Sequence, residues 1–209
     1  MAELTIYSLA EDCLEARVSG SDLAHKLADR LREAADFEAV VPGLETVAVR
    51  FDPAHISPDA VVARMEKAIV ASSTEAGALS EDEISVPMQY GGDDGPDFAA
   101  VCERTGLTAD ALIELHSQAR YRVALLGFTP GFAYLSGLPE RLNVPRLDVP
   151  RVRLPAGSVG ITSGYCGLYA MPGPGGWSII GRTDATLFDP NAPDPFRVKP
   201  GTVIRFEPQ

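Results

Sequence analysis

The 209-residue sequence has few cysteines, no long apolar run and few positive charges relative to negative ones. Its three cysteines, Cys13, Cys102 and Cys166, are scattered and odd in number, which argues against a disulfide framework. No Cys-x-x-Cys or His-x-x-x-His spacing occurs, so we expect no dedicated metal site. No apolar run approaches the roughly 20 residues that a bilayer-spanning helix needs, so we expect no membrane partner.

The composition also narrows the class of protein. Hydrophobic residues make up 45% of the chain, which is typical of a folded globular protein. The net charge of −11 argues against a nucleic-acid partner, because phosphate backbones attract basic proteins. The start Met1-Ala2-Glu3 lacks the basic and apolar regions of a signal peptide, so we expect a cytoplasmic protein.

The charge is unevenly distributed along the chain. Residues 1–117 hold 8 Lys and Arg against 23 Asp and Glu, whereas residues 118–209 hold 10 against 6. All the positive residues of the second part except Lys199 are arginines, and arginine suits planar recognition of carboxylate or phosphate. The alternative is that most of these arginines only keep the surface soluble.

The first 88 residues show the order β-α-β-β-α-β. Residues 4–9 alternate as a strand, 23–35 have helical apolar spacing, and 40–51 indicate two strands around a Pro-Gly turn. Ser57-Pro58 begins a second helix and 84–88 form a last strand. This order is typical of a ferredoxin-like sheet with two helices, and no catalytic group is evident in it.

A break in composition at residues 90–96 indicates a domain boundary, so we expect domains at 1–89 and 90–209. Two short helices, opened by Pro96 and Thr108, precede a strand at 121–126. The remainder is rich in Pro and Gly, with short apolar runs typical of a β-barrel or sandwich. The fold class is therefore α+β.

Residues 127–135 place two glycines and a proline among three aromatics. This composition indicates a rigid shaped loop that either lines a binding site or forms a structural corner. Two more Gly/Pro segments follow, at 155–161 and 172–183. In them Gly157 and Ser158 could present backbone N–H groups to an anion, although a plain turn is the simpler interpretation.

Four side chains of the second half are further candidates. Arg151 and Arg182 could grip an anion or pair with nearby carboxylates. Trp177, the single tryptophan, could form a ligand wall or a core contact. His116 lies near a helix end, where a histidine often only favours the helix dipole; its pairing with Cys166 as nucleophile and base has no local support.

Together these segments are far more specific than any one alone. Gly127-Phe128-x-Pro130-Gly131-Phe132-x-Tyr134-Leu135, Pro155-Ala156-Gly157-Ser158-Val159-Gly160-Ile161 and Pro174-Gly175-Gly176-Trp177-x-x-Ile180-Gly181-Arg182-Thr183 resemble the family variously called the B subunit of 5-oxoprolinase, allophanate hydrolase subunit 1 or the kinase inhibitor KipI. Leu115-His116 and Leu187-Phe188-Asp189 also fit. The detailed match spans roughly residues 84–207.

The resemblance implies a ferredoxin-like N-terminal domain and a cyclophilin-like β-barrel. It implies an enzyme subunit, inactive alone, that acts with a C-type subunit (allophanate hydrolase subunit 2) and a third, A-type subunit. Together they would open 5-oxoproline to glutamate, using ATP with Mg²⁺ in a site shared with the partner. Alternatives from the same resemblance are a module that inhibits a histidine kinase, and a carboxyltransferase-like subunit of urea or allophanate metabolism.

The resemblance also implies roles for the matching residues. His116, Arg151 and Arg182 would be catalytic, with the arginines holding carboxylate or phosphate. Substrate or phosphate would contact a set of loop residues: Phe128, Pro130, Gly131, Phe132, Gly157, Ser158 and Trp177. One departure stands out, because Tyr165-Cys166 replaces the usual Gln-Thr; it alters either ligand contact or packing.

Overall fold

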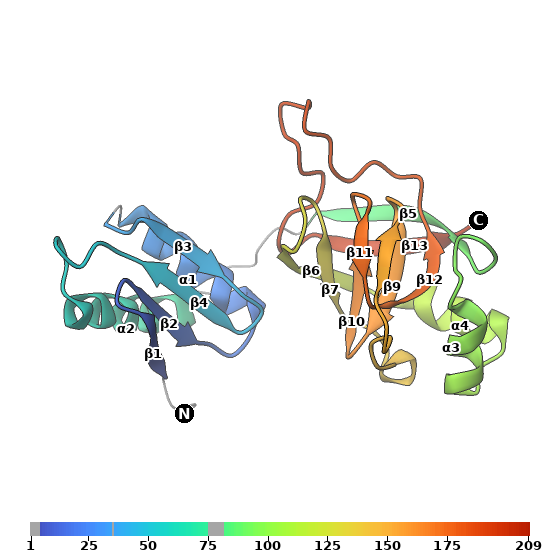
Figure 1. The fold of residues 1–209 in the computed structure, drawn as a ribbon, viewed down its shortest axis with the longest axis horizontal. Helices are drawn as coiled ribbons and strands as arrows, with labels where there is room; N and C mark the ends of the chain where they lie inside the picture. Colours follow the sequence, from blue (N-terminus) through green and yellow to red (C-terminus); the bar gives the residue numbers. More distant parts are fainter. Residues whose placement is uncertain (1–4, 35, 75–81) are drawn as a thin grey trace. The chain divides into compact units, whose positions relative to one another are not determined.

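The computed structural model describes residues 5–34, 36–74 and 82–209, and the chain forms two compact units, residues 1–79 and 80–209. In the first unit the elements are β1 (Ile6–Ala10), β2 (Cys13–Arg17), α1 (Ser21–Glu33), β3 (Ala39–Pro42), β4 (Thr46–Arg50) and α2 (Pro58–Thr74). The strands form an antiparallel sheet in the order β1-β2-β4-β3, with both helices on one face (Figure 1).

The core of this unit follows from the alternation along the strands. Leu14 and Ala16 of β2 and Val47 and Val49 of β4 point toward the helices and are buried, because successive strand residues face opposite sides of a sheet. Leu27 and Leu31 of α1 and Val61 and Met65 of α2 complete the layer. This layer is apolar throughout, so it serves packing and not chemistry.

The order of elements in this sheet differs from the prediction. The chain runs β-β-α-β-β-α, because a strand that the sequence pattern did not indicate, β2, follows β1 directly. The strand predicted at 84–88 lies instead in the second unit, as part of β5 (Glu83–Tyr90). The edge position beside β2 is filled by β1, so the sheet keeps two helices over four strands while its edge strand comes from the start of the chain.

The second unit is a closed seven-stranded barrel, so the α+β fold class is confirmed. Its strands follow the order β10-β7-β6-β13-β5-β12-β9, and β5 and β13 form a parallel pair. The elements are β5, α3 (Phe98–Thr105), α4 (Ala109–Gln118), β6 (Tyr121–Leu126), β7 (Ala133–Ser136), η1 (Glu140–Leu142), β8 (Arg151–Leu154), β9 (Ser158–Thr162), β10 (Tyr165–Leu168), β11 (Gly173–Gly175), β12 (Ser178–Arg182) and β13 (Val203–Pro208).

Because β5 belongs to the barrel, the second unit begins before residue 83 and not at residue 90. Two details of the sequence prediction are confirmed: Thr108 caps α4 by accepting a hydrogen bond from the Ala111 N–H (3.2 Å), and Gly106 ends α3 in the left-handed conformation. Another detail is wrong, since β7 begins at Ala133, inside the segment predicted to be a loop.

Two layers of side chains lie on opposite faces of the barrel wall. Ala133, Leu135 and Ile180 point into the barrel, whereas their neighbours Tyr134 and Ile179 point outward. The ribbon of β8 and β11 covers the outward layer, which also contains Phe132, Leu154, Tyr165, Tyr169 and Trp177. The long segment 183–202 extends from the barrel as a loop (Figure 1).

Candidate functional site

His116 lies inside the barrel wall and not in an open site. It is fully buried, and residues of four barrel strands surround it. Its Nδ1 is 2.7 Å from the Tyr90 hydroxyl and its Nε2 is 3.6 Å from Cys166 Sγ, while the rings of Tyr121 and Phe206 pack against it. The structure therefore brings together the Cys166–His116 pair, which had no support in the local sequence.

Burial determines the charge state of this cluster. It lowers the pKa of His116 to about 3 and raises the pKa values of the Tyr90 and Cys166 side chains. All three groups are thus neutral at pH 7, and a thiolate nucleophile is disfavoured because the low-dielectric interior penalises charge. Within this chain His116 is a hydrogen-bonded core residue, and its catalytic role stays a prediction.

Arg151 is held by an internal carboxylate. Its two terminal nitrogens donate to the Asp97 carboxylate at 2.8 and 2.7 Å, and the same carboxylate accepts the Ile179 N–H at 2.7 Å. The Asp97 side chain is 12% exposed and that of Arg151 is 32% exposed. This pair connects β8 and β12 to the start of α3, so the guanidinium is occupied in the isolated chain.

Arg182 is paired in a similar way, but more openly. Its Nε lies 2.7 Å from Asp94 Oδ1, as an ion pair without the direction of a hydrogen bond, and its side chain is 38% exposed. The carboxylate comes from the Gly91–Asp97 turn, which also donates the Gly91 and Asp97 N–H groups to the carbonyls of Ile180 and Ile179. Of the two arginines, Arg182 keeps more of its surface available to a ligand.

The Gly157 and Ser158 N–H groups, predicted to face an anion, have partners within the chain. The Gly157 N–H donates to the Tyr169 carbonyl at 2.7 Å, and the Pro155 carbonyl accepts from the Ser158 N–H at 3.4 Å and from the Ser158 hydroxyl at 2.8 Å. Gly157 has φ +80°, and a Cβ there would lie 1.9 Å from the Thr183 carbonyl oxygen. Glycine is needed at this position for close approach of two segments, which is the plain-turn interpretation.

The loop from Gly127 to Phe132 is closed by backbone hydrogen bonds and exposes an aromatic ring. The Thr129 N–H donates to the Gly127 carbonyl at 3.0 Å, a γ-turn that gives Phe128 a φ of 74°. Such a conformation costs a non-glycine residue about 1 kcal/mol or more. Phe128 is nevertheless 61% exposed, so a strained backbone conformation holds an aromatic ring in solvent.

Beside this ring lies a cleft of about 360 Å³, lined by Phe128, Pro130, Gly131 and Phe196 among others. A neighbouring hollow of about 350 Å³ also includes Phe196 and is bordered by Asp189, Arg197 and Lys199. We call these two hollows together the loop cleft. Its walls combine apolar rings with charges of both signs, which suits a small polar molecule.

The loop cleft contains three of the ten predicted site residues, namely Phe128, Pro130 and Gly131. Sequence reasoning missed Phe196, whose ring contacts that of Phe188, eight residues earlier, with 5.1 Å between centroids. Gly131 is required there, since a Cβ would lie 2.6 Å from the Phe188 Cβ. The family match at Leu187-Phe188-Asp189 pointed to this region, but it did not identify Phe196 as the residue that contacts Phe188.

Phe132 and Trp177 belong to the aromatic layer under the β8–β11 ribbon. The Phe132 ring meets Tyr134, Tyr169 and Trp177 edge-on, with centroids 4.7 to 5.7 Å apart. Trp177 is 7% exposed. Both residues are core contacts in this chain. Tyr165 packs against the same layer and is half-buried, so the departure at this position contributes to packing.

The Trp177 ring packs directly against the backbone of Gly167. A Cβ at this position would lie 2.4 Å from the Trp177 ring and 2.9 Å from that of Phe132. We expect Gly167→Ala to lower the free energy of unfolding by about 2 kcal/mol, because overpacking forces ring shifts. Urea denaturation followed by Trp177 fluorescence measures this. Gly173→Ala, where φ is not positive and the nearest atom would lie 3.9 Å from the added Cβ, is the control for a glycine-to-alanine change without a clash.

Among the described residues, no three His, Cys, Asp or Glu side chains are grouped to hold a metal ion. The arginines expected to grip phosphate are paired with Asp94 and Asp97. In the same ranges, every helix is too short or too polar to cross a bilayer.

Comparisons with known proteins agree with this architecture. Residues 5–198 match the family described as carboxyltransferase domain, subdomain C and D. The chain is 40% identical over 187 residues to the B subunit of 5-oxoprolinase from Escherichia coli O157:H7, covering 88% of this chain and 84% of the relative. It is 35% identical over 179 residues to the protein of the same name in Haemophilus influenzae, covering 86% and 83%.

A solved structure shows the same fold within a longer polypeptide. The crystal structure of TTHA0988 has a TM-score of 0.78 and 29% identity to this chain. The match covers 95% of this chain but 40% of the TTHA0988 chain. In that relative the two-unit fold is therefore continuous with further protein.

Proposed function

Because the chain belongs to the family of carboxyltransferase subdomains C and D, we propose that it is the B subunit of a 5-oxoprolinase. In this proposal it acts in the cytoplasm with a C-type and an A-type subunit. The assembly opens 5-oxo-L-proline to L-glutamate and hydrolyses ATP. Support comes from relatives with that name, which are 40% and 35% identical over most of both chains.

The structural observation behind the proposal is that Arg151 and Arg182 are both already paired with carboxylates. Both guanidinium groups expected to bind an anionic substrate are paired with Asp94 and Asp97 of the same chain. An anion would have to compete with these carboxylates, so further cationic or hydrogen-bonding groups are needed for a complete site. A partner protein would supply them, with the loop cleft as this chain's contribution.

A substitution in the loop cleft tests whether this chain contributes that cleft to a site completed by a partner. We expect Phe128→Gly to reduce glutamate formation by the complete three-subunit mixture at least tenfold, because the ring wall is lost. Stability should change by less than about 1 kcal/mol, since relief of the strained φ offsets the entropic cost of glycine. ADP and glutamate are measured with each subunit omitted in turn, alongside the melting temperature of the variant.

Two results would oppose the proposal. If the complete wild-type mixture forms no glutamate from 5-oxoproline, the substrate assignment is wrong. If Phe128→Gly retains full activity in an active mixture, the loop cleft is not part of the site. Loss of activity accompanied by loss of assembly would assign Phe128 to an interface, which size-exclusion chromatography of the mixture detects.

A further inference from the structure

The ribbon of β8 and β11 has an open edge. The two strands pair only with each other, through Leu154–Gly173 and Arg151–Gly175, in a separate two-stranded sheet. In the part of the chain that the structure describes, no strand pairs with the other side of β8. An unpaired strand edge presents backbone N–H and C=O groups to which another strand can add.

Two almost fully exposed valines lie at this edge. Val152 of β8 is 91% exposed and Val149, just before the strand, is 80% exposed; these are the highest values among the exposed large hydrophobic side chains of the described residues. Single exposed apolar residues are ordinary on a protein surface. Here two exposed β-branched side chains lie within four residues, one on the open-edged strand and one just before it, and burying such an apolar surface against a partner is favourable.

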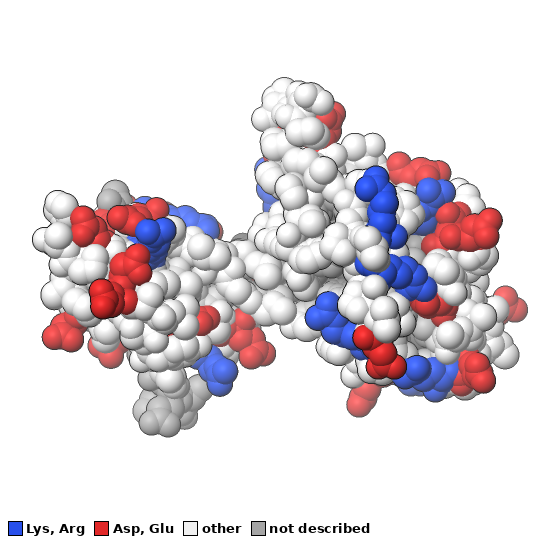
Figure 2. All heavy atoms as spheres, viewed as in Figure 1, with Lys and Arg blue, Asp and Glu red and all other residues white. Residues whose placement is uncertain are grey.

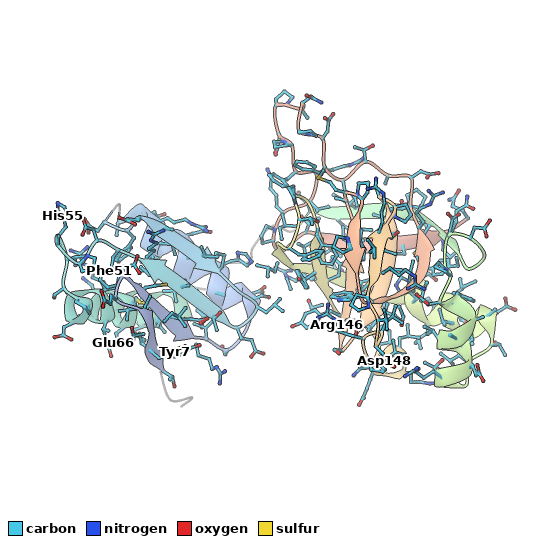
Figure 3. All side chains as sticks on the ribbon, in the orientation of Figure 1. Tyr7, Phe51, His55, Glu66, Arg146 and Asp148 are labelled. Carbon is cyan, nitrogen blue, oxygen red and sulfur yellow. The ribbon has the colours of Figure 1, made fainter. Side chains whose placement is uncertain are left out.

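The charge around the valines is positive. Arg146 and Arg153 are exposed and form no ion pair with any described residue, and Asp148 is the one acidic residue between them in the sequence. Figure 2 shows Lys and Arg side chains gathered on the face where β11 lies, and Figure 3 shows Arg146 and Asp148 on that face. On a chain of net charge −11 such a surface favours an acidic partner.

Contacts within the chain fix the position of β8 before any partner binds. Arg151, between the two valines, is tied to Asp97 by its two hydrogen bonds, and Leu154 at the end of β8 is buried in the aromatic layer. A rigid edge loses little conformational entropy when a partner binds. Segment 149–153 thus combines apolar side chains, unpaired positive charge and a fixed open strand.

We infer that segment 149–153, with Arg146 at its flank, is where the C-type partner docks, by adding an acidic extended segment to the open edge of β8. The inference rests on the proposed function, because the partner is defined by it. It places the contact on the ribbon, on the outer side of the barrel wall, and assigns Val152 as the apolar anchor.

The test measures binding of the purified C-type subunit to the full chain by titration calorimetry. We expect Val152→Asp to raise Kd at least tenfold, as loss of a central interface anchor does. Val41→Asp is the matched control, since Val41 is a 59% exposed valine on another edge strand, β3, and Kd should not change. Melting temperatures of both variants establish that each is folded.

A second measurement isolates the electrostatic part. The wild-type Kd should rise with NaCl concentration, and Arg153→Glu should raise Kd at low salt and flatten that dependence. Unchanged binding by both Val152→Asp and Arg153→Glu would overturn the inference while the 5-oxoprolinase assignment stands. A change in self-association of this chain, with partner binding intact, would overturn it equally.

The two proposals fail in different ways. If the wild-type chain binds no C-type subunit and the complete mixture forms no glutamate, the proposed function is wrong. If the wild-type chain binds and the mixture is active, only the position of the docking surface is in question, and the ribbon variants decide it.

Discussion

Replacing Asp97 with alanine is expected to lower the free energy of unfolding by about 3 kcal/mol. The carboxylate accepts three hydrogen bonds, two from Arg151 and one from the Ile179 N–H, and its side chain is 12% exposed. Its removal leaves a half-buried guanidinium and a backbone donor without partners, and the loss of one partner of such a pair costs more than the pair contributes.

The measurement is urea denaturation of Asp97→Ala beside Asp148→Ala. Asp148 is an exposed carboxylate on the same unit and forms no ion pair with a described residue, so its removal should change stability by less than about 0.5 kcal/mol. The double variant Asp97→Ala, Arg151→Met should recover part of the loss, because the unpaired charge is gone. If Asp97→Ala unfolds like the wild type, the pair has no structural role.

The same variants separate two roles for Arg151. As a structural residue, Arg151→Met lowers the melting temperature in proportion to its loss of activity. As a substrate-binding residue, it lowers kcat/KM of the assembled mixture with little change in the melting temperature. The hydrogen bonds to Asp97 favour the structural role in the isolated chain.

The local elements of the fold could be predicted because their signals are local. Alternation around Val49, the Thr108 cap and the Gly106 stop each depend on a few neighbouring residues. The place of β5 could not be predicted, because its partner β13 lies more than a hundred residues further along the chain. Which strands pair depends on the whole barrel, so the sequence of one strand does not identify its partner.

For the candidate site, the sequence indicated residue types but not their partners. Arg151 and Arg182 have the chemistry of anion binding, yet the carboxylates that occupy them come from a turn that precedes both. Likewise Cys166 and His116 are 50 residues apart in the chain and meet only through the barrel. The shaped loop at Phe128 was foreseen, because glycine and proline restrict backbone geometry locally.

Acid should destabilise this protein through His116. In the unfolded chain its imidazole takes up a proton near pH 6.5, whereas burial lowers the pKa of the folded form to about 3. Between these values the unfolded state binds more protons, so the contribution of His116 to stability is complete above pH 6.5 and declines as the pH falls toward 3. Each pH unit within this window costs at most about 1.4 kcal/mol.

The comparison that isolates this effect is His116→Leu, which removes the titrating group and keeps an apolar side chain. At pH 7 the variant should be less stable than the wild type, because the Tyr90 hydroxyl loses its partner. Between pH 7 and pH 4.5 the wild type should lose about 2.5 kcal/mol more than the variant in urea denaturation. Equal slopes for wild type and His116→Leu would show that His116 is already protonated, or accessible to solvent, in the folded barrel.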